Sequence, residues 1–99
     1  MITIDKIKKW AKPHDIGNGA KVTRFGNEAI EFSIVGGGTG LYGNFEDTFE
    51  VAIFDNLTGE FMTKFFYPEG SDDVIPYMSG EELVEMVNKL MKGKDFQVR

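Results

Sequence analysis

The sequence contains no cysteine, and this absence removes several kinds of chemistry at once. Without a thiol, the chain has no disulfide, no cysteine nucleophile, no iron–sulfur cluster and no cysteine-containing zinc site. Histidine is almost as scarce, because His14 is the only one. No serine or acid can be placed beside His14 from the sequence, so we predict no catalytic residue, no metal and no cofactor.

Long hydrophobic runs are missing too. No stretch approaches the roughly 20 apolar residues of a membrane span, and charged residues interrupt the N-terminal segment. We therefore expect a soluble, cytoplasmic protein without a membrane partner. With 99 residues, 41% of them hydrophobic, the chain is expected to form a single domain over residues 1–99.

Positive charge is nearly absent from the middle of the chain. Residues 26–88 carry thirteen acidic side chains against Lys64 alone, whereas residues 1–25 carry six bases and two acids. Residues 89–99 carry four bases and one acid. Because an acidic centre repels phosphate and attracts basic surfaces, we expect a protein partner with a basic surface and disfavour nucleic acid.

Hydrophobic patterning predicts an α+β domain. Thr3 as N-cap and Pro13 as terminator frame a helix over residues 3–12. Alternating apolar and polar residues predict strands over 20–25, 28–35, 48–55 and 60–67, with Gly26-Asn27 as the first hairpin turn.

A second helix is predicted over residues 80–92, after a loop over 68–78. Ser79 and Glu82 form a capping box at its start, and Gly93 is the expected C-cap. The tail over 94–99 is either an edge strand or loose. The order α-β-β-β-β-α with short hairpins predicts an antiparallel sheet with the helices packed on it.

The predicted strand over 60–67 gives the sheet an unusual second face. Phe61 and Phe65 would continue the core face, whereas Met62 and Phe66 would join Phe54 on the opposite face. That second face would be less polar than a solvated face, so we expect a helix, another subunit or a partner to cover it.

The stretch Gly36–Gly40, GGGTG, resembles the phosphate loop of tubulin-like GTPases. In that family the glycine turn leads into a helix whose N–H groups hold phosphate. Here a strand-like segment follows, and no lysine or arginine occurs between Gly36 and Thr63. We therefore predict no nucleotide site.

The same loop is instead a candidate protein-binding site. Leu41 and Tyr42 lie among five glycines, and the acids Glu46, Asp47 and Glu50 follow. An aromatic and an aliphatic side chain on an acidic loop suit a protein interface. The alternative is that Leu41 and Tyr42 fold back over the sheet edge and the loop is only a connection.

Together these features predict a non-catalytic protein-binding module. Small acidic inhibitors of the phage anti-defence or toxin-immunity type are the expected class. One alternative is a structural or assembly subunit, in the simplest case a homodimer, that self-associates through the Phe54–Met62–Phe66 face. Another is a small ligand-binding domain or enzyme that uses the glycine loop and the acids between Glu69 and Asp73.

Overall fold

The strands form one antiparallel sheet whose order follows the chain. The computed structural model describes residues 1–68, 73–92 and 95–99. β1 (Lys12–Pro13), β2 (Lys21–Gly26), β3 (Ile30–Gly36), β4 (Thr48–Asp55) and β5 (Ile75–Ser79) are neighbours in that order. β6 (Gln97–Val98) pairs with the end of β2, while β1 pairs with its start. The two short strands therefore share one edge of β2.

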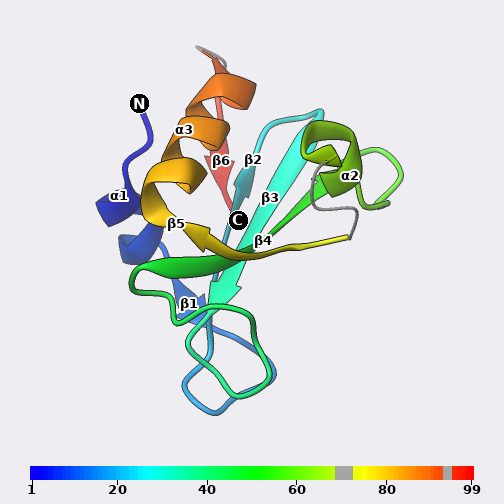
Figure 1. The fold of residues 1–99 in the computed structure, drawn as a ribbon. Helices are drawn as coiled ribbons and strands as arrows, with labels where there is room; N and C mark the ends of the chain where they lie inside the picture. Colours follow the sequence, from blue (N-terminus) through cyan, green and yellow to red (C-terminus); the bar gives the residue numbers. More distant parts are fainter. Residues whose placement is uncertain (69–72, 93–94) are drawn as a thin grey trace.

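Helices α1 (Ile4–Lys9) and α3 (Gly80–Met91) pack against this sheet, and a short α2 (Thr63–Phe66) follows β4 (Figure 1). The α+β class and the antiparallel sheet are confirmed. The predicted order α-β-β-β-β-α also holds for the principal elements, from α1 through β2–β5 to α3.

The core lies between the helices and one face of the sheet. Phe25, Phe32 and Ile53 lie opposite one another on β2, β3 and β4, and all three are fully buried. The buried face of α3 supplies Leu83 and Val87, which are also fully buried. The helix begins where the capping box predicts, with the Glu82 N–H donating to the Ser79 hydroxyl at 3.2 Å. Gly93, the expected C-cap, lies outside the described residues.

Helix α1 is shorter than the predicted helix over 3–12. Thr3 is its N-cap, as expected, but the helix ends at Lys9 and residues 12 and 13 pair with β2 instead. An edge strand tolerates Pro13 because no neighbour needs its missing N–H. The fully buried Thr23 of β2 donates its hydroxyl to the Ile7 carbonyl at 2.6 Å, which attaches the helix to the sheet.

The first hairpin turn lies two residues later than predicted. Gly26 still pairs with Glu31, and the Asn27 N–H donates to the Ile30 carbonyl at 2.9 Å. The turn is therefore centred on Glu28-Ala29. The Asn27 side chain stabilises it by accepting hydrogen bonds from the N–H groups of Ala29 and Ile30.

The predicted strand over 60–67 is wrong. Only Phe61 forms an isolated bridge, with Phe54, and the chain then turns into α2. Ile53 nevertheless keeps partners on this edge: its carbonyl accepts the Met62 N–H at 2.7 Å, and its N–H donates to the Thr63 hydroxyl at 2.9 Å. β5 pairs with the other half of β4, so two separate segments complete one strand edge.

Two further expectations change with this correction. The loop predicted over 68–78 ends early, because Ile75–Ser79 forms β5. Phe61, not Met62, lies against Phe54, with ring centroids 4.6 Å apart, while Met62 and Phe66 pack against the core. The predicted Phe54–Met62–Phe66 face therefore does not form, because α2 replaces the alternation of a strand.

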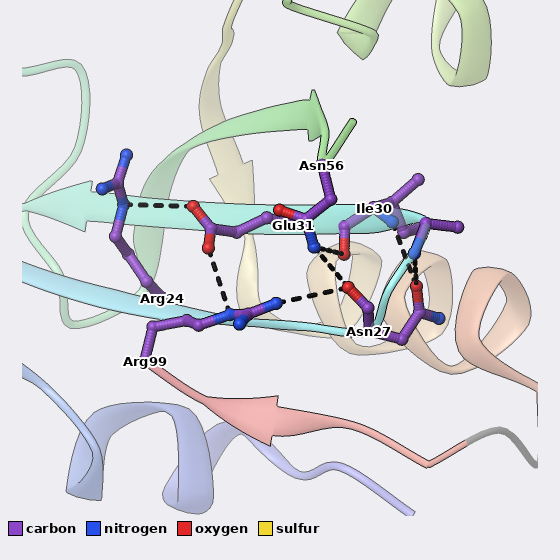
Figure 2. A network of polar contacts seen from close by, with 7 residues as sticks. Arg24, Asn27, Ile30, Glu31, Asn56 and Arg99 are labelled. Atoms are coloured by element: carbon purple, nitrogen blue, oxygen red, sulfur yellow. Dashed lines mark hydrogen bonds and ion pairs between the residues drawn. The ribbon is translucent and has the colours of Figure 1, made fainter. Parts of the chain in front are cut away.

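The C-terminal tail is held against the β2–β3 hairpin, which confirms the edge-strand alternative (Figure 2). Glu31 lies between two arginines, 3.6 Å from Arg24 Nε and 3.2 Å from Arg99 Nε. Arg99 Nη2 also donates to the Asn27 carbonyl at 3.2 Å, and the Asn56 amide donates to the same oxygen.

Within the described ranges, no helix is both long and apolar enough to cross a membrane.

Candidate protein-binding surface

The glycine loop between β3 and β4 is compact, and close backbone contacts account for its composition. A Cβ atom on Gly36 would lie 2.8 Å from the backbone nitrogen of Phe45, and one on Gly43 would lie 2.9 Å from the Phe49 Cα. On Gly38 it would lie 2.5 Å from the Ala20 Cβ, so the loop also packs on the segment before β2. Any larger residue at these positions would force the neighbouring backbone segments apart.

Tyr42 of this loop lies beside Tyr77 of β5. The Tyr77 N–H donates to the Tyr42 carbonyl at 3.0 Å, and the two ring centroids are 5.7 Å apart. The Tyr42 N–H in turn donates to the carboxylate of Glu50 at 3.2 Å. The loop therefore contacts β4 and β5 through Tyr42, while Tyr42 remains 50% and Tyr77 62% exposed. Leu41 is half-buried beside them.

Tyr77 adopts a backbone conformation that aromatic residues rarely take. Its φ is +55°, and the pairing of β4 with β5 shifts register at this point, between Phe49 and Val51. A positive φ at a non-glycine residue costs on the order of 1 kcal/mol. The domain thus holds the exposed Tyr77 on a strained backbone position, as it does the buried Phe45 of the glycine loop, whose φ is +59°.

A tight turn presents the next two acids to solvent. The Asn44 side-chain oxygen accepts the N–H groups of Glu46 at 2.8 Å, Asp47 at 3.0 Å and Thr48 at 3.2 Å. Asn44 also donates its amide to the Asp47 carboxylate at 2.9 Å. Glu46 and Asp47 are exposed, whereas Glu50 is half-buried where it holds Tyr42.

The structure adds acids from a distant part of the sequence. Thr48, at the end of the Asn44 turn, pairs with Ser79, the last residue of β5. Helix α3 begins at the next residue and carries Glu81 and Glu82 in its first turn. None of the ion pairs between described residues involves these five carboxylates. We call Leu41, Tyr42, Glu46, Asp47, Glu50 and Tyr77 the tyrosine surface.

Five of these six residues are the ones predicted from the sequence as a protein-binding site, and Tyr77 is added here because the structure places it beside Tyr42. The sequence predicts a loop over residues 68–78, and the only available signal was an aromatic residue after Pro76. The pairing that brings Tyr77 to Tyr42 spans 35 positions of the chain and has no local signature.

The remaining candidate groups lie elsewhere. His14 accepts the Ile16 N–H on Nδ1 at 3.0 Å. Glu69 and Asp72, two of the acids considered for a ligand site, lie outside the described residues. Within the described part of the chain, no three acidic or histidine side chains cluster closely enough to hold a metal ion.

The two basic ends of the sequence meet in space. The Ile2 N–H donates to the Asn88 side-chain oxygen at 2.9 Å, and the Asn88 amide donates to the Ile2 carbonyl at 2.8 Å. The Arg99 N–H donates to the Arg24 carbonyl at 2.8 Å.

Comparison with protein-family models, curated proteins and solved structures finds no match for this chain.

Proposed function

We propose that the domain is a non-catalytic protein-binding module whose tyrosine surface binds a basic surface of another protein. One observation carries this proposal: two half-exposed tyrosine rings are fixed side by side, next to carboxylates that form no ion pair with the described residues.

The rings suit the centre of an interface. Tyrosine supplies a large contact area with few rotatable bonds, so little conformational entropy is lost on binding. The Tyr77-to-Tyr42 backbone hydrogen bond and the Glu50 contact position the pair in advance. A partner would therefore not have to order the glycine loop.

The carboxylates suit the rim. Exposed Glu46 and Asp47 would attract lysine and arginine side chains, raise the association rate and make binding sensitive to salt. An acidic surface of this kind can occupy the basic site of an enzyme, which is how a small acidic inhibitor of the anti-defence or immunity type would act.

Affinity capture from the source organism's lysate tests the proposal with three tagged baits. These are the unaltered chain, a Tyr42→Ala/Tyr77→Ala variant and a Leu57→Ala/Phe65→Ala control. The control removes two side chains that are 87% and 75% exposed but lie outside the tyrosine surface. Thermal unfolding establishes that all three baits are folded.

We expect one stoichiometric partner that the control retains and the tyrosine variant loses. Its capture should fall with rising salt. Two further baits test the acids: Glu46→Gln should lower capture more than Glu28→Gln, which removes an exposed acid from the first hairpin turn. Equal capture by all baits would refute the assigned surface. Recovery of the bait alone, as a dimer or larger species, would favour the assembly-subunit alternative.

A further inference from the structure

A pocket with a basic lining lies beside the segment before β2 that packs on the glycine loop. It is bounded by the end of α1, by β1, by the segment between β1 and β2, and by the start of β2, with a volume of about 340 Å³. Three lysines line it, Lys8, Lys12 and Lys21, together with His14. No carboxylate is among the lining residues, and no ion pair between described residues involves these lysines.

The polar side chains among the lining residues can all donate hydrogen bonds. Each lysine ammonium can only donate. His14 already uses Nδ1 to accept the Ile16 N–H, so its neutral ring carries the proton on Nε2 and offers a further donor.

The wall opposite the helix is preformed. The His14 N–H donates to the Ala20 carbonyl at 2.9 Å, and the Ala20 N–H donates to the Gly17 carbonyl at 3.0 Å, which closes the segment into a compact loop. Ala20 is buried against Gly38 of the glycine loop. A Cβ atom on Gly17 would meet nothing within 4 Å, so the backbone there borders open space.

We propose that this lysine pocket binds the phosphate group of a small phosphorylated molecule. Three exposed lysines that line one pocket supply the positive charge that a compact anion with several oxygens requires, and Lys binds phosphate as a point charge. The volume is at the small end of the range for ligand pockets, and Ala11 and Pro13 give it an apolar side for the rest of the molecule. This site is separate from the tyrosine surface and does not depend on the function proposed for it.

Titration of ¹⁵N-labelled protein tests the proposal by NMR. The ligands are inorganic phosphate, adenosine 5′-monophosphate and adenosine, each at constant ionic strength. Two variants remove the same charge: Lys12→Gln/Lys21→Gln inside the pocket, and Lys6→Gln/Lys9→Gln on exposed positions of α1 outside it. Lys8→Gln alone provides a second pocket variant.

We expect saturable shifts of the Gly17, Gly19 and Ala20 amides with phosphate and with the nucleotide, but not with adenosine. Tighter binding of the nucleotide than of phosphate would identify a phosphorylated molecule as the ligand class, and equal binding would identify free phosphate. The pocket variant should weaken binding by about tenfold, and the control by less than about twofold.

Three results would overturn the proposal: absence of saturable shifts in the loop, equal loss of affinity in both double variants, or shifts centred elsewhere on the chain. A single-stranded oligonucleotide serves as a further probe. If it alone binds, and both double variants weaken it equally, the basic ends attract nucleic acid through their overall charge and the pocket is not a phosphate site.

Discussion

Replacing Thr63 by valine tests how the edge of β4 is held. Thr63 is 1% exposed, and its hydroxyl accepts the Ile53 N–H on the edge of β4 that faces away from β3, beyond the residues that pair with β5. Valine has nearly the same shape but no acceptor, so the variant leaves a buried N–H without a partner. That loss costs about 1–3 kcal/mol, of which burial of the added methyl group recovers up to about 0.8 kcal/mol.

The expected net loss of unfolding free energy in Thr63→Val therefore lies between about 0.2 and 3 kcal/mol, with a central value of about 1.5 kcal/mol. For a domain of this size, each kcal/mol lowers the melting temperature by about 4–8 °C. Urea unfolding and a thermal scan give these two quantities. Hydrogen exchange of the Ile53 amide adds a local measurement, because this amide should exchange faster in the variant than in the original chain.

Thr63→Ser is the matched control. Serine keeps the hydroxyl and removes a methyl group, so it should lose about 1 kcal/mol through packing while the Ile53 amide stays protected. A valine variant as stable as the original, with an equally protected Ile53 amide, would show that the side chain of Thr63 does not complete this edge.

Two further substitutions probe other contacts. Ser79→Ala removes the acceptor for the Glu82 N–H at the start of α3 and should lower stability by about 0.5–2 kcal/mol in urea unfolding; an unchanged midpoint would exclude the cap as a contributor. Glu31→Gln removes the carboxylate between Arg24 and Arg99 and should cost about 1 kcal/mol, less at high salt. Glu28 is an exposed acid in the hairpin turn just before β3, and Glu28→Gln should change stability by less than about 0.5 kcal/mol. Equal losses in both variants would contradict a specific role for Glu31.

The sequence predicts this fold well where the signal is local. The cap at Ser79 and the alternation of Phe49, Val51 and Ile53 each depend on spacing within one element, and both are confirmed. The strand predicted over 60–67 failed because Phe61, Met62, Phe65 and Phe66 satisfy a strand pattern and a helical turn equally. In this case tertiary contacts decide, since the Thr63 hydroxyl replaces the backbone partner that a strand would have offered.

The candidate sites divide in the same way. Leu41, Tyr42 and the nearby acids are visible in the sequence because an unusual loop composition marks them. Tyr77 becomes part of the surface only through the pairing of β4 with β5. The lysine pocket combines residues from a helix, two strands and a loop, so their charges could be counted in advance but their common site could not.

The attachment of both chain ends has a consequence for the kinetics of folding. The Ile2–Asn88 bonds join positions 86 apart, and the Arg99–Asn27 bond joins positions 72 apart. Closing loops of this length costs about 2 kcal/mol more chain entropy than closing a ten-residue loop. The β2–β3–β4 meander needs only short closures, so we expect it to form before Ile2 and β6 dock. Mutations at the two ends should therefore accelerate unfolding more than they slow folding.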